Sequence, residues 1–151
     1  AVQAVFPDAD IDAFETVDVD QDIAKQAISD AGIEGSIDEV SAVDGGEAGY
    51  VITVTEGEGY GGDIQMTVGI TADGSISGIS FLSISETAGL GMKAREESFY
   101  GQYVGVQADQ FYVSKDGGEG EPIDAISGAT ITSRAVTGGV NAAIAYFQNA
   151  F

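Results

Sequence analysis

Alternating apolar and polar residues predict a series of β-strands through the middle of the chain. The clearest alternation runs over 64–71, where every second residue is Ile, Met or Val. Residues 50–55 alternate in the same way, and 37–43 alternate more weakly. An Asp-Gly pair follows the 64–71 run and is typical of a hairpin turn. We therefore expect a further strand over 75–85, with a bulge at Gly78 where the alternation changes phase.

Helical periodicity flanks these strands. One helix is expected over 20–31, with Asp20 or Asp22 as its N-cap and a glycine directly after it. A second helix is expected over 91–103. The longest is expected over 133–148, where apolar residues recur on one face up to the C-terminal end of the chain.

Strands bracketed by helices favour an α+β fold, here a single domain with a twisted antiparallel sheet packed by helices. Residues 1–18 read as a short helix or an arm, a short strand is expected at 111–114, and 116–121 reads as an acidic, glycine-rich loop. We divide the domain into an N-terminal arm, helix and strand over 1–43 and a core over 44–151.

Composition restricts the chemistry. The 151 residues include no Cys and no His. Thiol nucleophiles, disulfides, Cys–His zinc sites and every triad that needs an imidazole are therefore excluded. Because the redox-active side chains that remain, Tyr and Met, are poor at physiological potentials, any redox activity must come from a bound cofactor.

The chain is strongly acidic, with a formal net charge of −20. This charge repels nucleic acid, so no DNA or RNA partner is expected, and it also repels free anionic cofactors. The acids suit a solvated surface that keeps an exported or salt-exposed protein soluble. The alternative is a calcium site, because 8–12 and 18–22 both have D-x-D-x-D spacing, but neither run has the Gly and Glu of an EF-hand loop. No metal is predicted.

No stretch of the sequence is apolar enough to span a bilayer. Residue 1 is Ala and no signal peptide is recognisable. We expect the chain to be a mature or truncated piece, which is compatible with a lost N-terminal membrane anchor.

A small-residue turn rich in hydroxyl groups precedes the last predicted helix. The sequence from Asp124 reads Asp-Ala-Ile-Ser-Gly-Ala-Thr-Ile-Thr-Ser. A helix N-terminus offers free N–H groups and a positive dipole end, so a phosphate would fit there, with Arg134 nearby. Thr132 or Ser133 is expected to cap the helix. The alternative is an ordinary turn before a capped helix. Ser127 is a poor nucleophile because no His is present as a base.

The segment Asp124-Ala-Ile-Ser-Gly-Ala-Thr130 resembles the flavinylation motif of the FMN-binding domain family. This family includes the G subunit of Rnf electron-transport complexes and the C subunit of sodium-pumping NADH:quinone oxidoreductase. The resemblance implies that a flavin transferase, using FAD as donor, joins FMN covalently to Thr130 through a phosphoester. It also implies that Asp124 is the acidic residue that the transferase requires.

Two earlier stretches resemble the same family. Glu86-Thr-Ala-Gly-Leu-Gly91, followed by Lys93, is similar to a family loop that lies against the flavin ring, although Ala88 replaces the usual Pro and no His precedes it. A glycine-rich turn around Tyr60 is similar to a second family motif; Tyr60 could instead be a core aromatic, and Lys93 a surface charge. The expected cofactor contacts are Tyr60, Glu86, Thr87, Ala88, Gly89, Leu90, Gly91, Lys93, Asp124, Ser127, Gly128, Ala129, Thr130 and Ser133.

The resemblance implies an extracytoplasmic electron-transfer flavoprotein, periplasmic or at the cell surface. It would be membrane-associated through the missing anchor or a partner subunit, and would relay electrons between other redox subunits or domains. Such a chain is an electron-transfer subunit of an oxidoreductase rather than a stand-alone enzyme. Two alternatives remain: the FMN-binding domain of an extracellular flavin-dependent reductase, and a non-redox acidic surface module.

Overall fold

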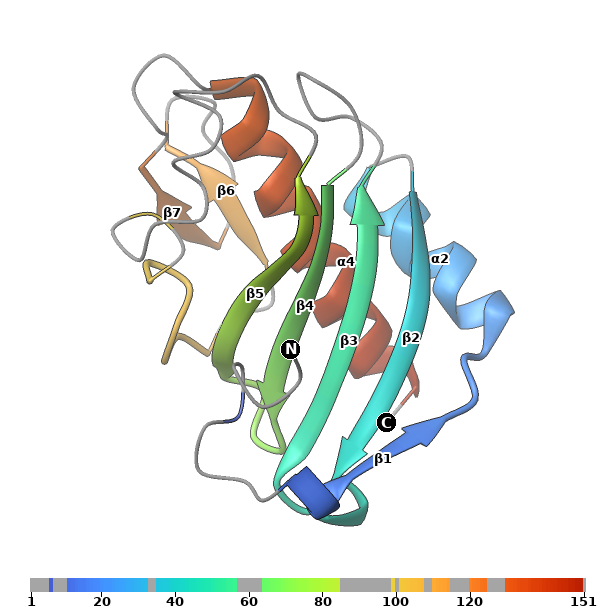
Figure 1. The fold of residues 1–151 in the computed structure, drawn as a ribbon. Helices are drawn as coiled ribbons and strands as arrows, with labels where there is room; N and C mark the ends of the chain where they lie inside the picture. Colours follow the sequence, from blue (N-terminus) through green and yellow to red (C-terminus); the bar gives the residue numbers. More distant parts are fainter. Residues whose placement is uncertain are drawn as a thin grey trace.

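Five strands form one antiparallel sheet in their sequence order, β1-β2-β3-β4-β5 (Figure 1). The computed structural model describes residues 6, 11–32, 35–56, 64–84, 99, 101–107, 110–114, 120–124 and 130–150, and for 11, 82–84 and 130–132 it describes the backbone alone. The elements are η1 (Ile11–Ala13), β1 (Phe14–Val17), α2 (Gln21–Ala31), β2 (Gly35–Val43), η2 (Asp44–Gly46), β3 (Gly49–Glu56), β4 (Ile64–Thr71), β5 (Ile76–Ile84), β6 (Phe111–Val113), β7 (Glu121–Ile123) and α4 (Thr130–Ala150). The predicted α+β fold with an antiparallel sheet and packed helices is confirmed.

The strands predicted from alternation are present, and so is the bulge. Gly69 of β4 pairs with Gly78 of β5, whereas the next residue, Ile70, pairs with Ile76. One extra residue, Ser77, therefore lies between the two pairs, beside the predicted Gly78. A second shift in register, between Gln65 and Met66 of β4, was not predicted.

The sequence signals at both ends of α2 act as predicted. The Asp20 carboxylate accepts hydrogen bonds from the N–H groups of Asp22 (3.0 Å) and Ile23 (3.2 Å). Gly32 ends the helix with φ at 70°, in the left-handed region that a residue without Cβ adopts at low cost. The backbone N–H of Asp20 donates to the Tyr146 hydroxyl at 2.9 Å, which ties the start of α2 to α4.

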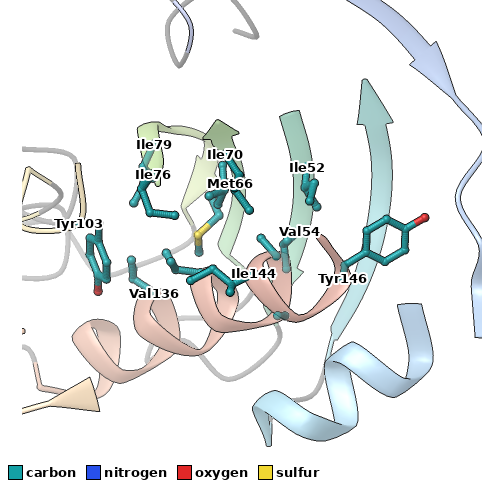
Figure 2. Close-up of a cluster of buried hydrophobic side chains, with 14 of the residues drawn as sticks. Ile52, Val54, Met66, Ile70, Ile76, Ile79, Tyr103, Val136, Ile144 and Tyr146 are labelled. Carbon is teal, nitrogen blue, oxygen red and sulfur yellow. The ribbon is translucent and has the colours of Figure 1, made fainter. Parts of the chain in front are cut away.

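The core lies between the sheet and α4, which covers one sheet face beside α2 (Figures 1 and 2). Inward residues of β3 and β4 meet the apolar face of α4, and Tyr103 and Tyr146 lie toward opposite ends of this layer (Figure 2). Among the described residues, neither α2 nor α4 combines the length and apolar character that a bilayer crossing requires.

Two short strands were not predicted. Within 1–18, predicted as a short helix or an arm, the described part contains the short helix η1 and the edge strand β1. Most of the predicted loop 116–121 lies outside the described residues, but its last residue, Glu121, begins β7. This three-residue strand is fixed by parallel pairing with β6 rather than by its own propensity. The predicted helix over 91–103 falls mostly outside the described residues; Phe99 is helical, and 101–105 form turns.

Helix α4 begins at Thr130, three residues earlier than predicted, and ends at Ala150. Hydroxyl residues often cap helices, so Thr132 and Ser133 were expected just outside the first turn. Both lie inside the helix instead, which makes the capping prediction wrong. Ser133 is fully buried.

Candidate functional site

The start of α4 lies at the end of the sheet where β3 finishes. Near the other end of the helix, the ring of Phe147 is 6.1 Å from that of Tyr50, at the beginning of β3. Gly139 packs near Glu56, the last residue of β3, because a Cβ on Gly139 would lie 3.9 Å from the Cβ of Glu56. Thr130 is a further ~14 Å along the axis, at 1.5 Å per residue. The helix N-terminus therefore extends past the end of β3 (Figure 1).

The two other family-like segments connect to the sheet at this same end. Glu56 pairs with Ile64 at the start of β4, and Ile64 pairs with Ile84 at the end of β5. The chain thus enters 57–63 and 85–98 from neighbouring strand ends. These two segments lie outside the described residues. The strand ends that border them, at Glu56, Ile64 and Ile84, are at the end of the domain where α4 begins.

Asp124 follows β7 and is held by one side chain from a distant part of the chain. Its backbone N–H donates to Gln102 Oε1 at 2.8 Å, and its C=O accepts from Gln102 Nε2 at 3.1 Å. The Asp124 side chain is exposed, and the Ser114 hydroxyl donates to its Oδ1 at 3.4 Å. The residue predicted to open the flavinylation motif therefore has a fixed backbone and an accessible carboxylate.

A second carboxamide holds β6 against α4. Asn141 Oδ1 accepts from the N–H of Phe111 at 2.7 Å, and Asn141 Nδ2 donates to the C=O of Phe111 at 2.9 Å. Because β6 pairs with β7 in parallel, this attachment also supports the strand that leads to Asp124.

An aromatic cluster lies under the first half of α4. The ring of Tyr103 is 5.9 Å from that of Phe99 and 4.9 Å from that of Phe111, both edge to face. The Tyr103 hydroxyl is 2.7 Å from Thr137 Oγ1, and Thr137 donates to the C=O of Ser133 at 2.8 Å. Burial raises the pKa of Tyr103 well above its ordinary value, so the hydroxyl stays protonated.

Sequence reasoning missed three polar residues near this end of the fold. Gln102 and Asn141 have no local signal, because each bonds to backbone far away in sequence. Glu56 is fully buried although it is an acid. Its position could have been found, since it continues the inward phase of Tyr50, Ile52 and Val54 along β3.

Only part of the predicted contact set falls on described residues. Asp124 ends the segment after β7, the Thr130 backbone begins α4, and Ser133 is buried in its first turn. Contacts of these three with a cofactor stay predictions. Residues outside the described part of the chain are Tyr60, Glu86, Thr87, Ala88, Gly89, Leu90, Gly91, Lys93, Ser127, Gly128 and Ala129.

The charge around the start of α4 differs from that of α2. The N-terminus of α2 has two acids, Asp20 as its cap and Asp22 in its first turn. The first turn of α4 has none, and Arg134, one of five cations in the chain, follows there with an exposed side chain. The positive dipole end of α4 therefore has no carboxylate in the first turn of the helix, although the chain has a net charge of −20. Within the described residues, no group of three or more acidic side chains converges as a metal site would need.

Comparison with known proteins gives matches over most of the chain. Residues 59–145 match the family described as the FMN-binding domain. The G subunit of the proton-translocating ferredoxin:NAD(+) oxidoreductase complex of Clostridium ljungdahlii is 37% identical over 136 residues, which are 87% of this chain and 74% of that protein. The G subunit of the Na(+)-translocating ferredoxin:NAD(+) oxidoreductase complex of Acetobacterium woodii is 42% identical over 104 residues, 67% of this chain and 50% of that protein.

A more distant relative matches almost the full chain. The G subunit of the ion-translocating oxidoreductase complex of Methanosarcina acetivorans is 33% identical over 148 residues, 97% of this chain and 72% of that protein. The chain therefore spans between half and about three quarters of the length of these three relatives.

Proposed function

Because the chain belongs to the FMN-binding domain family, we propose that it is an electron-transfer flavoprotein domain that carries FMN covalently through a phosphoester to Thr130. The observation that carries this proposal is the placement of Thr130 as the first residue of α4, a helix of 21 residues. The motif from Asp124 to Thr130 leads directly into that helix N-terminus.

The residues present fit a flavin phosphate at this place. The first N–H groups of a helix have no partners within it, and its dipole favours an anion there. The first turn of α4 has no acid that would compete with the phosphate. Arg134 adds a positive charge close by. The backbone of the first turn and Thr130 would hold the phosphate end of FMN.

The ring end of FMN needs a second surface. We assign this surface to the segments containing Tyr60 and Glu86–Gly91. Both segments follow strands that finish at the end of the sheet where α4 begins. We assign to Lys93 the role of neutralising the phosphate or the reduced flavin. FMN would supply the redox chemistry, accepting and donating electrons, while the protein orients it and tunes its potential.

Covalent attachment suits the charge of the chain. A protein of charge −20 repels a free dianionic nucleotide, and FMN lost outside the cytoplasm is not easily replaced. In the attachment step the Thr130 oxygen bonds to the phosphorus of the FMN half of FAD, the pyrophosphate bond breaks, and AMP leaves with the hydroxyl proton. A flavin transferase would carry out this step, with Asp124 as the acid it recognises.

We further propose that the domain relays electrons between other redox subunits, as in an Rnf-type complex, on the extracytoplasmic side of a membrane. Support comes from the relatives, which are named as G subunits of ion- or proton-translocating oxidoreductase complexes. Residues 44–151 would form the FMN-binding core, and 1–43 would complete it through the pairing of β2 with β3. The runner-up is an extracellular flavin-dependent reductase, which would reduce a small acceptor without partner subunits.

Intact mass spectrometry of the chain co-expressed with a flavin transferase tests the attachment. Wild type and Thr132→Ala should gain the mass of one FMN less one water, whereas Thr130→Ala should not. Thr132 is the matched control because it is a threonine in the same helix turn. An unmodified wild-type mass under these conditions would reject the proposal.

A further inference from the structure

The carboxamide of Gln102 fixes Asp124 from both sides of its backbone. It accepts from the Asp124 N–H at 2.8 Å and donates to the Asp124 C=O at 3.1 Å. Two hydrogen bonds to one residue set the orientation of both adjoining peptide groups. We propose that Gln102 is a positioning residue for flavin attachment, which holds the start of the 124–130 segment so that Thr130 is presented to the transferase. This inference rests on the proposed function of Thr130.

Gln102 is itself well anchored. Its Nε2 also donates to the C=O of Phe99 at 3.2 Å, and its backbone N–H donates to the same oxygen at 3.2 Å. The next residue, Tyr103, is fully buried and hydrogen bonds to Thr137 of α4 at 2.7 Å. Asp124 is therefore tied, through Gln102 and Tyr103, to the same helix that begins with Thr130.

The strand before Asp124 needs such support. β7 has three residues, and Pro122 at its centre has no N–H to donate. Beyond its three-residue ladder with β6, two backbone bonds flank the strand, from the N–H of Ser114 to the C=O of Ile123 (2.9 Å) and from the N–H of Glu121 to the C=O of Gln110 (3.1 Å). The two bonds to Gln102 continue this attachment past the end of the strand.

Five residues, 125–129, separate Asp124 from Thr130 in the sequence. Thr130 begins α4 and Asp124 is clamped to Gln102, so the two motif residues that the structure describes are both held by the folded domain. A transferase that recognises Asp124 while the Thr130 hydroxyl attacks FAD benefits from this arrangement, because the two groups are presented at a set separation.

The chain offers a matched control for this role. Asn141 makes the same pair of bonds, N–H and C=O of one residue, to Phe111 at the start of β6. Loss of Asn141 should therefore lower stability as loss of Gln102 does, but it leaves the Asp124 clamp in place. Comparing Gln102→Met with Asn141→Leu separates positioning from stability, since each substitution keeps the side-chain shape and removes its hydrogen bonds.

The experiment measures the initial rate at which purified, unmodified chain gains FMN from FAD in the presence of a flavin transferase, followed by intact mass. Melting temperatures are recorded for every variant. Gln102→Met should react about tenfold more slowly than wild type, because the two hydrogen bonds that fix the Asp124 backbone are lost. The rate for Gln102→Glu should lie between those of wild type and Gln102→Met, since its carboxylate still accepts a hydrogen bond from the Asp124 N–H. Asn141→Leu should be slowed much less than Gln102→Met, because Asn141 acts on Asp124 only indirectly, through β6 and β7.

The outcomes separate the two proposals. If wild type gains no FMN, or if Thr130→Ala gains it equally, the proposed function fails. If wild type reacts at Thr130 and Gln102→Met reacts at the same rate, only the role of Gln102 is overturned. Equal slowing of Gln102→Met and Asn141→Leu would reduce Gln102 to a stabilising residue and also overturn it. If Gln102→Met does not fold, the soluble Gln102→Glu decides, and a wild-type rate for it overturns the proposal.

Discussion

Replacing Asn141 by Leu tests how α4 holds the strands that lead to the site. The substitution keeps the approximate shape of the side chain and removes two hydrogen bonds, of 2.7 and 2.9 Å, to the backbone of Phe111. Both bonds are partly buried, so water replaces them incompletely. The start of β6 then loses its polar attachment to the helix.

The expected cost follows from these two bonds. Each neutral hydrogen bond contributes about 1 kcal/mol net, and a buried backbone group that loses its partner costs about 1–3 kcal/mol. Additional apolar contact by Leu offsets part of this loss. We expect Asn141→Leu to lower the free energy of unfolding by about 2–4 kcal/mol, equivalent to roughly 5–15 °C in melting temperature for a domain of this size.

Urea unfolding of the chain without flavin, followed by circular dichroism, measures the effect. The midpoint should fall while the dependence of the unfolding free energy on urea stays unchanged. The matched control is Asn149→Leu, because Asn149 donates to the C=O of Ala145 at 2.8 Å within the same helix but at an exposed position. A loss below about 0.5 kcal/mol for Asn141→Leu, or one equal to that of the control, would refute the reasoning.

Two further predictions concern the same core. Gly139→Ala should leave the stability of wild type nearly unchanged, because a gain of about 1 kcal/mol in helix propensity is offset by a Cβ only 2.7 Å from Met66 Cε. In a Met66→Val background, which removes this close contact, the same substitution should stabilise the protein. Equal effects in both backgrounds would contradict the close packing of Gly139 against Met66. Burial raises the pKa of Tyr103 above its ordinary 10.0, so its contribution is present below that pH and is lost as pH rises. Urea unfolding should therefore show a steeper alkaline loss for wild type than for Tyr103→Phe, and parallel pH curves would contradict this.

Much of the sheet could be predicted because local pattern and tertiary environment agree. The alternation over 64–71 matches β4 residue for residue, with Ile64, Met66, Val68 and Ile70 all fully buried. Asp20 caps the start of α2 and Gly32 ends the helix, as local capping chemistry requires. These features depend on neighbours within a few residues, which a single sequence contains.

The remaining features depend on long-range contacts. β7 has three residues with a proline among them, and it exists because β6 lies beside it. The Gln102–Asp124 clamp joins residues 22 apart, and nothing adjacent to Gln102 signals it. The hydroxyl residues at the start of α4 favoured a later beginning, yet the helix starts at Thr130. Thr130 itself was recognised by family resemblance, since physics alone allowed an ordinary capped helix.

Peptide mapping of wild-type protein matured by a flavin transferase tests the central claim most directly. The chain is digested, and the peptide that absorbs as a flavin is fragmented to locate the added FMN. We predict that the modification lies on Thr130, the first residue of α4, and on no other hydroxyl between Ser127 and Ser133. FMN found on another residue, or released intact from unmodified peptide by denaturation, would contradict the assignment.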